Sequence, residues 1–520
     1  MNDVGERRSP RFRLIVIVVI LMVVSAITLA AALLVENAEL RWGVGPVLHL
    51  LTTGIMLLVS GVCVNALPRV VTEVWRLKRE AYEQVVELLH RLGQALRRPL
   101  RLSGVAAIVA ALMAAGVFLR PPPTGLEPGE LVVMTAFPDD PGDARSMLAE
   151  QWNRLNPENR VKFHYAPVNS DEQHARMVND AKPGGEHLAD LYVLDIPWME
   201  EFAVRDYVRP LDMSRLQDRD LGDFVPKILD TCYHDGKLWG LPLNSDVGLI
   251  FTRTGIPGVQ EPQTWDDYFG ATAKAGVATA RTSSPGIESA NAAQLAADDE
   301  MLTITALEAI WAAGGRVVGT NGQAALTSDR TSVDFTPADL SGIEKLAAAS
   351  RDPDLVLTGG DEAKETSAEV AAKTFGAGRT SYMRNWAVAS DAVGEKVEFE
   401  VTAPPTASVL GGQNLTISST TDKPRAAQAL MQFLTNFSSQ QILSEVGGFV
   451  PTRQSAFTYS RRPEAEQLRT ALNQARLRPI TPNYTEFSNV FRQGIARALN
   501  NDGNLEESFG RELAEILTRP

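Results

Sequence analysis

The sequence predicts an α/β fold for residues 130–520, preceded by three transmembrane helices. Three observations support this prediction: strand and helix patterns alternate after residue 130, long apolar runs occur before residue 120, and a Pro-rich segment separates the two regions. Alternating strands and helices form a parallel sheet with helices on both faces. Apolar runs of about 20 residues cross a bilayer as helices.

The predicted membrane spans are residues 14–35, 44–67 and 102–119. The first is almost wholly apolar and would be roughly 33 Å long as a helix, enough for a hydrocarbon core of roughly 30 Å. A second apolar stretch follows it directly, where a cleaved signal peptide would have a small-residue cleavage site. Residues 1–120 are therefore predicted to be a multi-pass membrane anchor.

Basic residues predict how this anchor is oriented. Four arginines precede the first span and eight Lys or Arg residues lie in residues 68–101, whereas residues 36–43 contain only Arg41. Short loops rich in Lys and Arg stay in the cytoplasm, so the N-terminus is predicted to be cytoplasmic and the C-terminal domain extracellular. Residues 68–101 also have the apolar spacing of an amphipathic helix. This helix could pack on the bilayer, form a dimer seam or bind a cytoplasmic partner.

Composition excludes several functional classes. Residues 121–520 contain 36 Lys and Arg against 55 Asp and Glu, and this acidic balance argues against general binding of nucleic acid. The two cysteines, Cys63 and Cys232, provide neither a disulfide framework nor a metal quartet. The six histidines lack metal-ligand spacing, and a Gly-rich phosphate loop is absent. We expect no metal, no cofactor and no nucleic-acid partner.

After a stiff linker at 121–129, the hydrophobic pattern predicts an outer domain of alternating elements. Residues 271–300 are weakly periodic and open a second helical region. Parallel sheets bind ligands beyond the carboxyl ends of their strands, where Asp139, Asp140 and Asp195 are expected. The predicted elements are strands at 130–137, 160–168, 188–196 and 409–418, an extended run at 240–253, and helices at 143–156, 171–182, 301–313 and 424–446.

Six segments in this domain together carry a resemblance to one protein family. The segments are DLYVLDIPWMEEFAVRDYVRPLD at 190–212, GKLWGLPLNSDVGLIFTR at 236–253, QTWDDYF at 263–269, FGAGRTSYMRNW at 375–386, LGGQNLTIS at 410–418 and GGFVPTRQSAF at 447–457. In order and spacing these segments resemble family 1 extracellular solute-binding proteins. These proteins are the sugar receptors of ATP-driven importers, and the resemblance is strongest to the trehalose and maltose binders. The resemblance covers nearly all of residues 130–520.

The resemblance implies a two-lobed α/β fold of the periplasmic-binding-protein type, which closes over its ligand. The first lobe would comprise about 130–246 and 410–450, and the second about 247–409 and 451–520. The chain would cross between the lobes near 244–248, 410–414 and 450–453, where Gly and Pro can absorb a hinge rotation.

The resemblance also implies a ligand site between the lobes. A sugar needs carboxylates and amides for its hydroxyls and aromatic plates for its C–H faces. Each candidate also has a structural alternative, such as local capping for Asp246, core packing for Trp386, capping of a helix in the lobe for Trp198, and an ion pair for Arg453. The expected ligand-binding residues are Asp139, Asp140, Asp195, Trp198, Asn244, Asp246, Glu300, Trp386, Gly412, Asn414 and Arg453.

The function implied is binding without catalysis. The domain would capture a carbohydrate and deliver it to the permease and ATPase subunits of an ABC importer. An alternative is a sensor or scaffold that signals through the membrane helices. The sequence departs from the family where Asp299 precedes Glu300 in place of an aromatic residue, and where the first strand ends in Ala136 and Phe137 in place of a frequent Trp. These departures favour a smaller or more polar ligand.

Overall fold

The computed structural model describes residues 125–136, 143–167, 169–216, 221–358, 367–393 and 397–519. Within these ranges, no helix is both long and apolar enough to cross a membrane. The three predicted spans, the helix at 68–101 and the first residues of the linker lie outside the described residues. Gly125–Pro520 belong to one folding unit.

Strands and helices alternate at the start of this unit, as predicted. β1 (Leu131–Thr135) pairs in parallel with β2 (Val161–Tyr165) on one side and with β3 (Leu191–Asp195) on the other. The connections are α5 (Ala144–Leu155) and α6 (Ser170–Ala181). The carboxyl ends of the three strands therefore meet at one edge of the sheet, where parallel sheets bind ligands.

One long strand, β7 (Gly240–Arg253), is shared by two halves of the sheet. Its first half pairs antiparallel with β12 (Leu410–Ser418), which also pairs with β3. Its second half pairs antiparallel with β10 (Thr380–Trp386) and β11 (Phe399–Thr402). We call the strands on the β12 side the first half-sheet and those on the β10 side the second half-sheet. The predicted extended run at 240–253 is confirmed.

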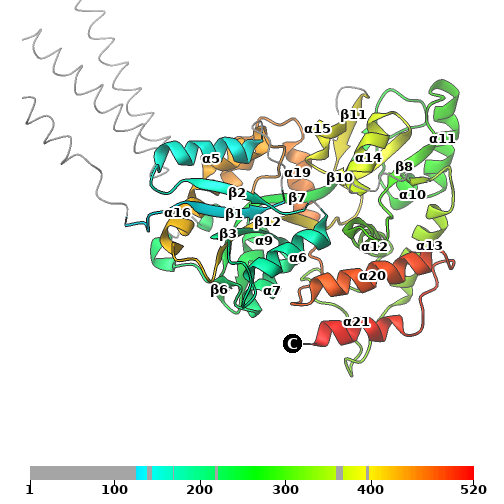
Figure 1. Cartoon of the computed structure of the whole chain (residues 1–520). Helices are drawn as coiled ribbons and strands as arrows, with labels where there is room; N and C mark the ends of the chain where they lie inside the picture. The colour runs from blue at the N-terminus through cyan, green and yellow to red at the C-terminus, as the bar shows by residue number, and fades with distance from the viewer. Residues whose placement is uncertain are drawn as a thin grey trace, which may run out of the picture. The chain divides into compact units, whose positions relative to one another are not determined.

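The strand order is β2-β1-β3-β12-β7-β10-β8-β9, with β4 beside β12 and β11 beside β7. Figure 1 shows β7 running from the first half-sheet into the second. The other described elements are α7 (Met199–Val204), β4 (Val208–Arg209), α9 (Pro226–Leu229), β5 (Tyr233–His234), β6 (Lys237–Leu238), α10 (Trp265–Phe269), α11 (Ala271–Ser283), β8 (Ser289–Ala293), α12 (Glu300–Ala312), α13 (Pro337–Ser350), β9 (Val356–Thr358), α14 (Ser367–Gly376), α15 (Ala389–Val393), α16 (Pro424–Leu434), α17 (Phe437–Glu445), α18 (Gln454–Thr458), α19 (Ala465–Gln474), α20 (Tyr484–Leu499) and α21 (Phe509–Thr518), with short 3₁₀ turns at Ile196–Trp198, Met213–Arg215 and Asp230–Cys232.

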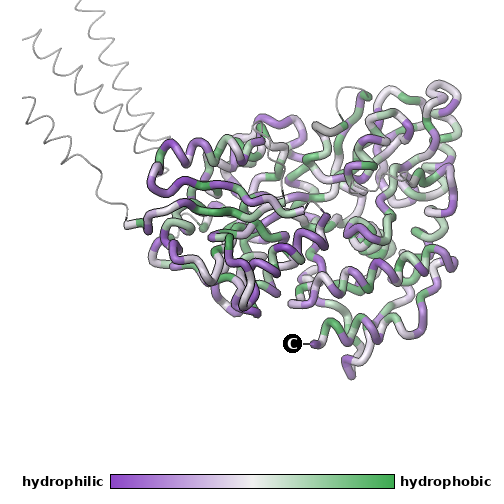
Figure 2. The backbone as a smooth tube through the Cα atoms, viewed as in Figure 1, coloured by the Kyte–Doolittle hydropathy of each residue, from purple (hydrophilic) through white to green (hydrophobic). Residues whose placement is uncertain are grey.

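Helices cover both faces of the first half-sheet. One hydrophobic cluster joins α5, α16 and α17 to the strands, and another joins α6 and α7 to the opposite face. The outer helices alternate between hydrophilic and hydrophobic residues along the chain, as Figure 2 shows. This alternation is typical of helices that bury one face only.

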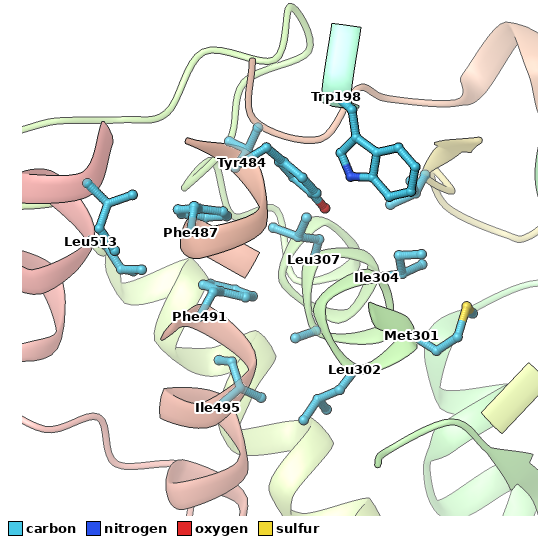
Figure 3. Packing of buried hydrophobic residues seen from close by; sticks show 14 of the residues in the cluster. Trp198, Met301, Leu302, Ile304, Leu307, Tyr484, Phe487, Phe491, Ile495 and Leu513 are labelled. Atoms are coloured by element: carbon cyan, nitrogen blue, oxygen red, sulfur yellow. The ribbon is translucent and has the colours of Figure 1, made fainter. Parts of the chain in front are cut away.

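The core beside the second half-sheet is built around α12. Every residue from Met301 to Trp311 is buried, so this helix packs on all sides. Figure 3 shows Leu302 and Leu307 on the side of α12 that faces α20, whereas Ile304 lies on the side of Trp198. Each buried residue of this kind stabilises the fold by roughly 1.5–3 kcal/mol. The same cluster includes Trp198, which follows β3, so the two half-sheets share one continuous core.

Two predicted boundaries were wrong for identifiable reasons. The weakly periodic region 271–300 contains β8, whose residues Ser-Ala-Asn-Ala-Ala are small and lack the β-branched pattern of a strand. The predicted helix at 424–446 is two helices, α16 and α17. Asn436 separates them because its side chain accepts a hydrogen bond from the amide of Ser439 and so caps α17.

Gly412 provides a test of the β7–β12 crossing. Its φ is +116°, and a Cβ there would lie 2.5 Å from the carbonyl oxygen of Asn244. Gly412→Ala should lower the free energy of unfolding by about 2–4 kcal/mol, measured by chemical denaturation. Gly286→Ala is the control, because an added Cβ there meets nothing within 4 Å. Equal effects of the two substitutions would contradict the close approach of the strands.

Candidate functional site

The carboxyl end of β3 meets β12 and β7 at one point of the sheet. Asp195 of β3 lies beside Gln413 of β12, which in turn lies beside Asn244 of β7. Gln413 Nε2 donates a hydrogen bond to Asp195 Oδ1 at 3.3 Å. Pairing of three strands thus places polar residues from distant segments in a single row. The sequence predicted Asp195 and Asn244 but not Gln413.

Asp246 lies two residues further along β7, and apart from Arg253 at the strand's end it is the only residue of β7 that is not fully buried. Its Oδ1 accepts hydrogen bonds from the amides of Val247 at 2.9 Å and Ala387 at 3.0 Å. Burial among surrounding protein atoms raises the pKa of Asp246 to about 7, against the opposing effect of the two amides and Arg384. Near neutral pH this carboxyl can therefore both donate and accept.

Trp386 ends β10 next to Asp246, and its indole is partly exposed. Gly411 leaves room for this ring, because a Cβ at that position would lie 3.0 Å from it and 3.4 Å from the Cβ of Asp246. The structure thus brings together three predicted site residues, Asp246, Trp386 and Gly412. They lie where β7 passes from one half-sheet to the other.

An ion pair that the sequence did not predict lies under this indole. Arg384 Nη2 and Nε donate hydrogen bonds to the two carboxylate oxygens of Glu308 at 2.6 and 3.0 Å, and both side chains are less than one-tenth exposed. The same carboxylate accepts a hydrogen bond from the amide of Val409. The Arg384 guanidinium lies 4.3 Å from the centre of the Trp386 ring. One face of the indole is thus covered by a neutralised cation.

A second buried cluster joins β3 to α12. Arg478 is only 4% exposed and lies 3.1 Å from Glu300 Oε1 and 3.6 Å from Asp195 Oδ2. The Glu300 carboxylate also accepts hydrogen bonds from the hydroxyls of Tyr484 and Ser488. The predicted residues Asp195 and Glu300 are therefore linked through Arg478, which the sequence did not identify.

Burial raises the pKa of both Asp195 and Glu300 above their ordinary values, and the positive charge of Arg478 acts in the opposite direction. A second arginine, Arg492 of α20, forms an ion pair with Asp171 of α6. Both arginines thus connect helices beside the second half-sheet to elements of the first. The two half-sheets are held together here by charge as well as by the shared core.

Three further candidates have structural contacts. Trp198 is 2% exposed and packs in the core, with its ring centre 5.4 Å from that of His174. Asn414 is fully buried and donates a hydrogen bond to the hydroxyl of Thr231 at 3.0 Å. The Arg453 guanidinium lies 4.0 Å from the Phe224 ring centre and forms an ion pair with Asp223 at 3.4 Å. Asp139 and Asp140 lie outside the described residues.

A cavity of about 20 Å³ lies between the second half-sheet, α10 and α12. It has room for about one water molecule. Arg384 and Glu308 line it together with Gln294 and aromatic residues of α10. No local sequence pattern marks Arg384, Glu308 or Arg478, because each acquires its partners from segments tens to hundreds of residues away. Gln294 was not predicted either.

Comparisons with known proteins identify a family and a fold. The model of the family described as bacterial extracellular solute-binding protein matches residues 148–468. A probable ABC transporter-binding protein of Deinococcus radiodurans is 23% identical over 394 residues, which cover 71% of this chain and 84% of that protein.

Two solved structures have the same fold. Maltose-bound MalE3 of T. maritima superposes with a TM-score of 0.62 at 22% identity and covers 75% of this chain and 98% of its own. An ABC transporter solute-binding protein of Thermotoga lettingae, bound with α-D-tagatose, has a TM-score of 0.62 at 18% identity and covers 75% and 99%. The two-lobed α/β architecture of the periplasmic-binding-protein type is therefore confirmed.

The Arg478 cluster leads to a first prediction for this site. Arg478→Met leaves the buried Asp195 and Glu300 carboxylates without their cation, so the free energy of unfolding should fall by about 3–5 kcal/mol in chemical denaturation. Arg154→Met is the control, since Arg154 and its partner Glu150 are both mostly exposed and such pairs contribute little. An Arg478→Met protein as stable as this control would refute the role of the cluster.

The raised pKa of Asp246 leads to a second prediction. Its folded-state pKa of about 7 lies above the ordinary value, so the folded state binds the proton more tightly and loses stability as pH rises from about 4 to about 7. Asp246→Asn cannot ionise and keeps the oxygen that accepts the two amide bonds. The Tm of this variant minus that of the wild type should be larger at pH 7.5 than at pH 4.5. An identical difference at both pH values would contradict the shifted pKa.

Proposed function

Because this chain belongs to the bacterial extracellular solute-binding proteins, we propose that it captures a neutral carbohydrate between its two lobes and delivers it to an ABC importer. The observation that carries this proposal is the group of Asp195, Asn244, Asp246 and Trp386 at the crossing of β7. Carboxylates and amides match the hydroxyls of a sugar, and the exposed part of the indole matches its C–H face.

The ligand class is supported by the charge balance of the site. Arg384 is neutralised by Glu308, and Arg478 lies between Asp195 and Glu300. An anionic ligand would therefore find no unpaired cation in the site, and burying an unpaired charge is unfavourable. The structural relatives that bind maltose and α-D-tagatose have ligands that are neutral and rich in hydroxyls.

We assign the first lobe to about 130–246 and 410–450, and the second to about 247–409 and 451–520. This division falls where β7 leaves β12 and begins to pair with β10. The hinge would comprise residues near 244–248, 410–414 and 450–453. An isolated bridge pairs Ser245 with Val450, which brings two of the three crossings side by side.

Opening of the lobes would have to break the contacts that cross between them. These are the ion pairs of Arg478 with Asp195 and of Arg492 with Asp171, together with the packing of Trp198 beside Tyr484. A ligand that binds Asp195 would take over part of these interactions. Glu300 would then contribute by holding Arg478 in place, and the protein would need no catalytic group.

The three predicted spans would tether this domain to the outer face of the cell membrane. The permease and ATPase subunits of the importer would be its partners. The proposal requires the C-terminus to be extracellular, so a reporter fused after Pro520 that is active only in the cytoplasm should give no signal. Signal from such a fusion would refute this orientation.

A sensor or scaffold is the second candidate function. It is favoured by the predicted amphipathic helix at 68–101, because a simple tether needs no cytoplasmic element. Purification of the chain from its native membrane distinguishes the two functions. A co-purifying permease and ATPase support transport, whereas a signalling protein without them supports sensing.

The main prediction is stabilisation by a sugar. Because a ligand that binds only the folded state raises its stability, at least one mono- or disaccharide in a broad panel should raise the Tm of the full chain in detergent. Asp246→Ala and Trp386→Ala should abolish this rise while the proteins stay folded. Glu150→Ala, on the exposed surface of α5, should retain it. No response of the wild type to any neutral sugar would refute carbohydrate capture.

A further inference from the structure

The cavity beside α12 is lined by polar groups that lack partners. Gln294, which follows β8, is 2% exposed, and neither Oε1 nor Nε2 has a hydrogen-bond partner among the described residues. Arg384 Nη1 is also buried without a partner, although Nη2 and Nε bind Glu308. Both residues line the cavity. Buried polar groups are normally satisfied, so these atoms indicate that another molecule completes the site.

The missing partner can be described from the groups themselves. Gln294 Oε1 needs a donor, whereas Gln294 Nε2 and Arg384 Nη1 need an acceptor. A hydroxyl group supplies both functions on one oxygen. The charge of Arg384 is already balanced by Glu308, so the site offers no net charge to an anion or a cation.

The remaining walls are apolar and partly aromatic. Trp265 and Phe269 of α10 stack with ring centres 4.8 Å apart, and Ile250, Pro404 and Pro405 complete the lining. Such walls suit the C–H groups that accompany a hydroxyl on a sugar carbon. A volume of about 20 Å³ admits one hydroxyl-bearing group and not a whole ring.

We propose that this cavity is a subsite that receives one neutral hydroxyl-bearing group of the bound carbohydrate, through Gln294 and Arg384. Arg384 joins it to the crossing of β7, because the same guanidinium lines the cavity and stacks on Trp386. This inference rests on the proposed function. It assigns to the second lobe the recognition of one hydroxyl-bearing group of the ligand. It makes Gln294 a specificity residue.

The test compares two glutamines that are equally buried. Gln294→Met keeps the length of the side chain and removes only groups without partners. Gln428→Met, in α16, breaks two hydrogen bonds between the side-chain amide and the backbone of Asp212. Both glutamines are 2% exposed. The full-length variants and the wild type are purified in detergent, and their Tm and their affinities for D-glucose, maltose and glucose 6-phosphate are measured by thermal unfolding and calorimetry.

Without ligand, Gln294→Met should keep or raise the Tm, whereas Gln428→Met should lower it. With ligand, Gln294→Met should bind the neutral sugar at least about tenfold more weakly than the wild type, which corresponds to the loss of about one hydrogen bond. Gln428→Met should bind it as the wild type does. Glucose 6-phosphate should bind the wild type more weakly than the neutral sugar does.

Three results would overturn the subsite. They are equal affinity of Gln294→Met and the wild type for the neutral sugar, tighter binding of glucose 6-phosphate than of the neutral sugars, and a loss of Tm in Gln294→Met as large as in Gln428→Met. The first leaves carbohydrate capture intact and refutes only the role of Gln294. If neither D-glucose nor maltose binds the wild type, the subsite fails together with carbohydrate capture by these sugars.

Discussion

The continuous strand β7 is the constraint on which the rest of the structure depends. The backbone of its first half pairs with β12, and the backbone of its second half pairs with β10 and β11. One extended segment therefore sets the position of both half-sheets. Such a strand is buried almost throughout, and Asp246 is the place inside it where solvent reaches a side chain. Partial burial still removes hydration from the Asp246 carboxyl, and the two backbone amides that donate to its Oδ1 offset part of this cost.

The ion pairs that join the two half-sheets are of a kind that a ligand can replace. Buried ion pairs such as Arg478 with Asp195 contribute little net stability, since the attraction is offset by the loss of hydration. Removing one partner of such an ion pair is costly, because the other charge stays buried without a partner. Replacing that partner with a ligand hydroxyl that forms a hydrogen bond costs much less. The aromatic and aliphatic core around α12 is different, because nothing in a ligand restores its buried area. We therefore expect opening to pivot at the strands and to leave α12 and α20 packed together.

The sequence predicted those parts of the fold that local patterns specify. The alternation from β1 to β3, the whole of β7 and the helix α12 follow from periodicity, turn residues and caps. The strand β8 was missed because its five small residues have no pattern, and Asn436 was not recognised as a cap inside an apparently continuous amphipathic helix. For the site, the family resemblance identified Asp246 and Trp386 as candidates. It could not identify Arg478 or Gln294, whose environments are created only by tertiary packing.

One departure from the family pattern has a structural counterpart at Asp299. The family often has an aromatic residue at this position, but the Asp299 carboxylate caps α12 by accepting a hydrogen bond from the amide of Met301 at 2.8 Å. Glu300 is bound by Arg478, Tyr484 and Ser488, and Arg384 covers one face of Trp386. At Asp299 an aromatic side chain is thus replaced by a carboxylate, and paired charges lie beside the remaining indole. A long, flat oligosaccharide would lose stacking in such a site, whereas a short and hydroxyl-rich sugar would gain hydrogen bonds, and this exchange favours the smaller ligand.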